Sequence, residues 1–192
     1  MRIEERFVVK AAAGEVWSFL VDPRRVVGCV PGGELEEVLD ERTFRGQIRV
    51  TVGALSLAYR GRVRLAEVDA AALRVTIVGE ASEGSGTGSA RLTLRSWLVA
   101  RPDGATEVVA LLEAEVVGRI VRILRGMVEQ FAHEVFQDFA ACVRSTVESE
   151  ASGRRAPAPR REPMRVMPLL LRTLRAWLAG LVRLRGDGAP RA

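Results

Sequence analysis

Apolar residues change their spacing near residue 118, from every second position to every third or fourth. Between residues 43 and 116 they alternate with Arg, Thr and Ser, which predicts half-buried antiparallel strands with one face in water. Between residues 119 and 148 the spacing is helical and predicts one long helix of about 45 Å. A sheet that is followed by one long amphipathic helix predicts an α+β fold in which the sheet buries the helix stripe.

The remaining elements fit this plan. A strand at 3–9 and short helices at 14–20 and 24–27 are expected first, and Asp22 and Pro23 form the start of the second helix. Six antiparallel strands are expected next, and the alternation delimits five of them, at 43–52, 55–65, 73–78, 90–99 and 106–116. The helix stripe consists of Ile120, Leu124, Met127, Phe131, Val135, Phe139 and Cys142. This order predicts a curved sheet that grips a single C-terminal helix and leaves a space between them.

Charge divides the chain into a domain and a tail. Residues 151–192 hold 10 arginines against 2 acidic residues, a balance of +8, whereas the first 150 residues hold 19 basic and 22 acidic groups, a balance of −3. We therefore expect a domain at 1–149, a disordered Pro/Arg linker at 150–163, a basic amphipathic helix at 164–186 and a disordered end at 187–192.

The tail helix has the pattern of a membrane-surface helix. Leucines and one Trp gather on one side and arginines flank them, so we expect contact with an anionic membrane. The residues expected at the membrane are Leu170, Leu171, Leu174, Trp177, Leu178, Leu181, Arg172, Arg175 and Arg183. Two alternatives stay open: docking on a partner protein, and folding back over the mouth of the domain's own cavity.

Other classes of protein and site are disfavoured by the sequence. The start of the chain lacks a signal region and no stretch is apolar enough to cross a bilayer, so we expect a cytoplasmic protein that is peripheral on the inner face of the cell membrane. The basic residues lie beside leucines rather than on a polar, aromatic-interleaved face, which argues against nucleic-acid binding. Cys29 and Cys142 have no metal-site or redox spacing and are expected to be buried free thiols.

Several motifs in residues 1–148 resemble the CoxG family of carbon monoxide dehydrogenase subunits, which belongs to the START-like (SRPBCC, Bet v 1-like) helix-grip superfamily. They are Phe7-Val8-Val9 before Val16-Trp17-Ser18-Phe19-Leu20, then Asp22-Pro23, Gly28-Cys29-Val30-Pro31-Gly32, Gly46–Gly53 and Tyr59-Arg60-Gly61. Ala11-Ala12-Ala13 departs from the family, which usually has a proline there. The resemblance implies a non-catalytic protein that binds a lipophilic, menaquinone-like quinone and attaches a molybdenum hydroxylase of the CO dehydrogenase type to the membrane, with no covalently bound cofactor and no metal.

A lipophilic ligand would lie between the sheet and the helix. Gly46, Gly61 and Ala90 are expected to leave room there, and Tyr59 is a candidate polar contact for a ligand carbonyl. The candidate lining residues are Trp17, Leu20, Phe44, Ile48, Val50, Leu57, Tyr59, Val75, Leu92, Leu94, Leu112, Met127 and Phe131. The competing interpretation is that these residues only form a packed core.

Catalytic residues are not indicated. His133 is the chain's one histidine, and it is expected to be exposed or in an ion pair rather than a general base. Glu113 and Glu115 alternate with Leu112 and Ala114 along their strand, so their side chains are expected on the face in contact with water. Two alternatives to the quinone-binding function stay open: a membrane-recruitment adaptor without a ligand, and an enzyme of the polyketide cyclase type.

Overall fold

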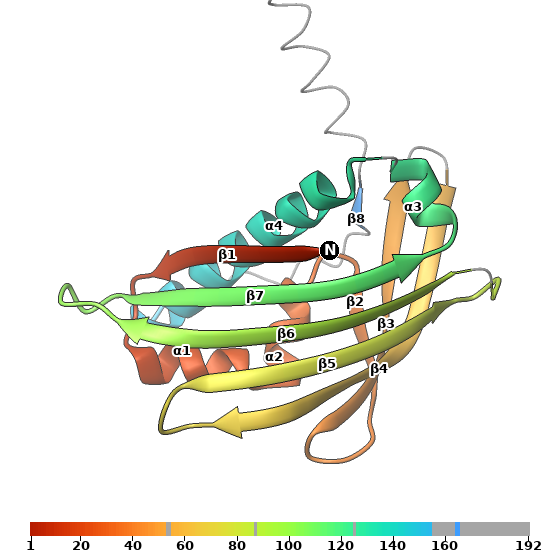
Figure 1. Ribbon diagram of the computed structural model, residues 1–192. Helices are drawn as coiled ribbons and strands as arrows, with labels where there is room; N and C mark the ends of the chain where they lie inside the picture. Colours follow the sequence, from red (N-terminus) through yellow and green to blue (C-terminus); the bar gives the residue numbers. More distant parts are fainter. Residues whose placement is uncertain (53–54, 87, 125, 155–163, 166–192) are drawn as a thin grey trace, which may run out of the picture.

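A computed structural model describes residues 1–52, 55–86, 88–124, 126–154 and 164–165. Seven strands form one strongly curved antiparallel sheet in the order β1-β7-β6-β5-β4-β3-β2 (Figure 1). They are β1 (Arg2–Val9), β2 (Gly33–Val38), β3 (Thr43–Val52), β4 (Leu55–Asp69), β5 (Arg74–Glu83), β6 (Ser89–Ala100) and β7 (Thr106–Val117). The predicted antiparallel sheet is confirmed, but the strand expected at 55–65 continues to Asp69 and the one expected at 73–78 continues to Glu83.

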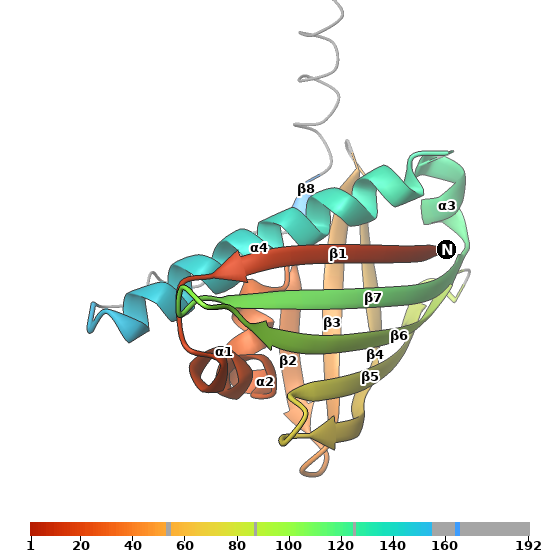
Figure 2. The same cartoon turned by 60° about the vertical axis from the view of Figure 1, so that its left-hand side comes forward.

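Helices lie on the concave side of this sheet. The helix α4 (Val128–Ala151) runs along β1, and α1 (Ala13–Leu20) and α2 (Pro23–Val26) lie at one end of the sheet (Figure 2). Asp22 caps α2 because its side chain accepts hydrogen bonds from the backbone of Arg24 and Arg25, and a short 3-10 turn, η1 (Val27–Cys29), follows. The helix-grip fold predicted from the sequence is confirmed.

The prediction of one unbroken helix over 119–148 is wrong. A short helix, α3 (Arg119–Leu124), comes first, and α4 begins only at Val128. Gly126 lies between them with a φ of +71°, a left-handed conformation that glycine adopts without the penalty of a Cβ. The break separates the two ends of the predicted stripe, so that Ile120 and Leu124 pack independently of α4's later turns.

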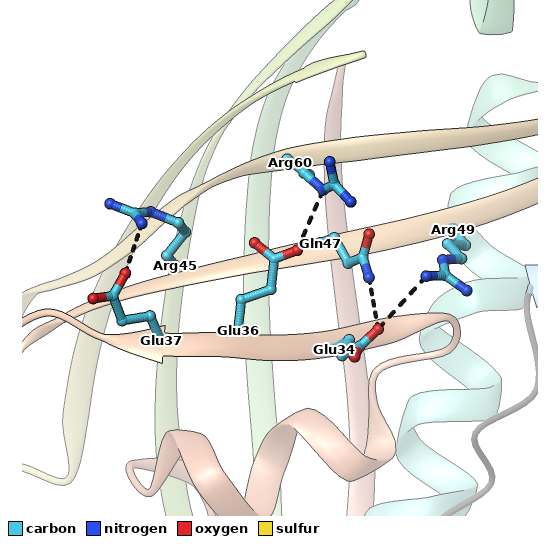
Figure 3. A network of polar contacts seen from close by, with 7 residues as sticks. All are labelled: Glu34, Glu36, Glu37, Arg45, Gln47, Arg49 and Arg60. Atoms are coloured by element: carbon cyan, nitrogen blue, oxygen red, sulfur yellow. Dashed lines mark hydrogen bonds and ion pairs between the residues drawn. The ribbon is translucent and has the colours of Figure 1, made fainter. Parts of the chain in front are cut away.

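The strand β2 has no clear signature in the sequence. Its pairing with β3 shifts register between Leu35 and Glu37, and such a bulge interrupts the alternation on which a strand prediction depends. Charged side chains cover this edge on the outer face (Figure 3). Arg45 and Arg60 reach Glu37 and Glu36 of β2 at 2.6 and 3.3 Å, which protects an edge strand from pairing with another chain.

The chain returns to the sheet after α4. A two-residue strand, β8 (Met164–Arg165), pairs in parallel with Val50 and Thr51 of β3. The tail helix predicted from residue 164 therefore does not begin there, and the rest of it lies outside the described residues. The predicted domain boundary at 149 falls inside α4, which continues to Ala151.

The buried apolar residues form two separate clusters. The first joins α1, η1 and the later turns of α4 to one end of the sheet, and it includes Val9, Val16, Phe19, Leu98, Val108, Ala140, Val143 and Val147. The second lies under α3 at the opposite end and includes Val50, Leu57, Tyr59, Ile120 and Leu124. The middle of the concave face belongs to neither cluster.

The two cysteines are bonded to each other, which corrects the prediction of free thiols. Cys29 of η1 and Cys142 of α4 form a disulfide across 113 residues, with their Cα atoms 5.3 Å apart. Sequence spacing could not reveal this pair, because only the packing of η1 against α4 brings the two positions together.

Candidate functional site

The concave face of the sheet carries the predicted lining residues. In the register of the strands Ile48 pairs with Tyr59, and Leu94 pairs with Leu112, so these side chains lie on the same face as the core clusters. Side chains at every second position of a strand share a face, and the strand pairing places all the predicted lining residues of the strands on this one. They are Phe44, Ile48, Val50, Leu57, Tyr59, Val75, Leu92, Leu94 and Leu112. The structure therefore brings the strand part of the predicted set together.

Their burial divides these residues between core and surface. Phe44, Val50, Leu57, Tyr59 and Val75 are at most 6% exposed and act as core. Trp17 and Leu20 pack partly buried against the first cluster, and Ile48 and Phe131 against the second. Leu94 and Leu112 are half-buried and Leu92 is exposed.

An apolar surface is left open in the middle of the concave face. Val63 of β4 and Leu92 of β6 are 40% and 37% exposed. Both pair with Gly79 of β5, so they are one strand apart on either side of a residue without a side chain. Val63 was not among the predicted site residues, although its phase in the alternation indicates this face. Val63 and Leu92 form an open apolar row, and a flat or chain-like apolar molecule could cover this part of the concave face.

The glycines expected to leave room have a different role. A Cβ on Gly61 would lie 1.9 Å from the carbonyl oxygen of Glu80, and one on Gly46 would lie 2.6 Å from that of Glu34. Both glycines therefore permit close approach of neighbouring strands where the sheet bends. Ala90 pairs with Ala81 in the same cross-strand row as Gly61. The bend, rather than space for a ligand, explains these glycines.

A polar corner lies at the α3 end of the concave face. Tyr59 is 5% exposed and its hydroxyl has no hydrogen-bond partner within the described structure. Its cross-strand neighbour Glu83 is also buried, and Arg119 of α3 lies 4.0 Å from the Glu83 carboxylate. Burial raises the pKa of the Tyr59 hydroxyl, the charge of Glu83 raises it further, and Arg119 lowers it. The hydroxyl is thus kept protonated as a hydrogen-bond donor.

Met127, a predicted lining residue, and His133, the chain's one histidine, do not line the concave face. Met127 is 38% exposed in the turn between α3 and α4, because the helix break turns it away from the sheet. His133 of α4 is half exposed and contacts Glu5 of β1, which agrees with the predicted ion pair. No cluster of metal-ligating side chains occurs among the residues that the structure describes.

A broad hollow of about 750 Å³ is lined mainly by residues of the opposite face of the sheet. Three arginines, Arg62, Arg64 and Arg91, and three glutamates, Glu80, Glu113 and Glu115, line it, together with Met1, Val78 and other apolar residues. Glu113 lies 3.3 Å from Arg95, and the solvated position predicted for Glu113 and Glu115 is confirmed.

The predicted membrane residues Leu170 to Arg183 lie outside the described part of the chain. Within that part, none of the helices has the length and apolar character needed to cross a membrane.

Solved structures with the same fold support the helix-grip assignment. A conserved protein from Geobacillus kaustophilus superposes with a TM-score of 0.71 at 19% identity, covering 78% of this chain and 97% of its own. The Zhui aromatase/cyclase from Streptomyces sp. R1128 gives 0.59 at 16% identity, covering 81% and 99%. A START superfamily protein from Mycobacterium smegmatis gives 0.52 at 14% identity, covering 78% and 98%. Identities this low establish the fold alone.

The family is set by the sequence of the domain. None of the curated proteins compared with the chain matches it. The family model that describes CoxG, a subunit of carbon monoxide dehydrogenase, matches residues 6–148, which span β1 to the last turns of α4. The chain therefore belongs to the CoxG family of carbon monoxide dehydrogenase subunits.

Proposed function

We propose that this protein is a non-catalytic carrier of a lipophilic, menaquinone-like quinone that links a molybdenum hydroxylase of the CO dehydrogenase type to the cytoplasmic face of the membrane. The observation that carries the ligand part is the open apolar row at Val63 and Leu92. Covering it would remove apolar surface from water at about 25 cal/mol per Å². The link to the enzyme rests on family membership.

Tyr59 supplies the polar end of such a site. Its buried hydroxyl lacks a partner within the described structure, and an unsatisfied buried donor costs about 1–3 kcal/mol. A ligand carbonyl that accepts this hydrogen bond would recover part of that cost. An apolar floor with one donor at its end suits a quinone better than a pure hydrocarbon.

The membrane part rests on the tail. Residues 166–192 hold the leucines, the Trp and the arginines expected at an anionic surface. Full-length protein should co-sediment with anionic vesicles, and Leu174→Glu/Trp177→Glu should reduce that binding strongly. Equal binding of the two proteins would refute a membrane role for the tail.

Ligand binding is tested by a matched pair of substitutions on β6. Leu92→Glu puts a charge on the concave face, whereas Val99→Glu puts one at a similarly exposed apolar position, 43% against 37%, on the opposite face. Titration with 2-methyl-1,4-naphthoquinone, followed by Trp fluorescence, should show at least tenfold weaker binding for Leu92→Glu and unchanged binding for Val99→Glu. Equal effects of the two substitutions would contradict a site on the concave face.

An enzyme of the cyclase type is the second candidate, because structural neighbours of the chain include aromatase/cyclases. The carrier, the recruitment adaptor and the enzyme can be distinguished by what the purified protein binds or converts. A co-purified, chemically unchanged quinone in native mass spectra supports the carrier. A protein that neither co-purifies nor binds a quinone supports a recruitment adaptor, and turnover of an added polyketide would establish the enzyme.

A further inference from the structure

The end of the domain at α3 combines exposed apolar and basic side chains. Val117, at the end of β7, is 57% exposed, and Met127, just after α3, is 38% exposed. Arg122 is exposed between them and Arg119 is half-buried. Ile120 and Leu124 of the same short helix are buried in the second cluster. The inward side of α3 is thus already packed, and its outward side is basic with apolar residues at both ends.

The charge of this segment is of one sign. Residues 116–128 contain arginines at 119, 122 and 125 and no acidic residue. The nearest acids in sequence are Glu115 and Glu129 on either side, and Glu83 is the acid that lies against Arg119. The first 150 residues together carry a balance of −3, so this segment is locally basic within a slightly acidic domain. Each basic residue near an anionic lipid surface adds about 1 kcal/mol of attraction.

The strand β8 brings the chain back to the sheet just before the tail sequence begins. After α4 ends at Ala151, near the first cluster, the chain returns to pair with Val50 of β3 at Met164. Val50 belongs to the second cluster together with Ile120 and Leu124 of α3. Arg165, the residue before the leucine- and arginine-rich sequence, therefore pairs with the strand whose Val50 packs together with α3.

We propose that Val117, Arg119, Arg122 and Met127 form a second contact with an anionic lipid surface, which holds the α3 end of the domain against the bilayer beside the tail. This inference rests on the proposed membrane role and adds an orientation to it. Two weak contacts on one chain reinforce each other because the second forms at high effective concentration. The orientation places the Tyr59 corner of the grip nearest the lipid.

Vesicle co-sedimentation of full-length variants tests this contact. Val117→Glu/Met127→Glu should reduce binding to phosphatidylglycerol-containing vesicles several-fold, and Arg122→Glu should reduce it at least about fivefold at low salt. Val38→Glu/Val99→Glu is the matched control, because these residues are 38% and 43% exposed near the ends of β2 and β6, away from α3. Circular dichroism should show the same fold in all variants, since every substituted position is exposed.

The outcomes separate this inference from the proposed function. If the control binds like wild type and both α3 variants bind less, the contact is supported. If Leu174→Glu/Trp177→Glu loses binding while the α3 variants bind like the control, the tail anchor stands and the α3 contact is refuted. If wild-type protein itself does not bind vesicles, the membrane role and this inference both fail.

Discussion

Single residues determine how sharply the sheet can bend. Replacing Gly61 by Ala would put a Cβ 1.9 Å from the Glu80 carbonyl oxygen, and a backbone clash cannot be relieved by a rotamer change. We expect Gly61→Ala to lower the free energy of unfolding by about 2–3 kcal/mol. Gly14→Ala is the control, because nothing lies within 4 Å of that position in α1 and alanine favours a helix by about 1 kcal/mol. Urea unfolding measures both, and an unchanged stability for Gly61→Ala would contradict the close approach of β4 and β5.

Tyr59 gives the domain a measurable response to alkaline pH. The pKa of its hydroxyl is raised by burial and by Glu83, so folding favours the protonated form. This contribution to stability is fully present below the unfolded value of about 10 and is lost as the pH rises through the folded value. Because Tyr59 is the chain's one tyrosine, tyrosinate absorbance reports this residue alone. We expect a midpoint above that of free tyrosine, and a smaller alkaline loss of stability in Tyr59→Phe; a midpoint at the free value would contradict the buried position.

At the scale of elements, the disulfide ties η1 to α4. Cys29→Ser/Cys142→Ser should lower the free energy of unfolding by about 2–4 kcal/mol, since the bond closes a long loop of the unfolded chain. Chemical unfolding with and without reductant measures the change. Thiol titration of the denatured, unreduced protein should find no free cysteine, and two free thiols per chain would contradict the bond.

The elements also show how far the sequence could predict this fold. Alternation predicted β3 to β7 well because each strand has one buried and one solvated face, as in β3, where the bounds 43–52 agree. The break at Gly126 was hidden because Ile120 and Phe131 keep a helical spacing across it. The bend at Gly61 was misread as ligand space, since a glycine does not reveal in sequence which atoms approach it.

At the scale of the whole molecule, the two core clusters leave an apolar surface that neither cluster covers. The sequence predicted that the candidate lining residues of the strands share one face of the sheet, because parity along a strand decides this. It could not predict which residues on that face are open, such as Leu92, and which are packed, such as Leu57, because that depends on where α3 and α4 lie across the sheet.

The central claim is that the concave face takes a quinone from a membrane. The most direct measurement is to mix the domain, with its tail removed after Arg165, with sedimentable vesicles containing a menaquinone, and to assay quinone in the supernatant after the vesicles are pelleted. A carrier predicts that quinone appears in the supernatant in proportion to the protein, and that Leu92→Glu abolishes this transfer while Val99→Glu does not. Quinone that stays in the pellet whatever the amount of folded protein would contradict the proposed function.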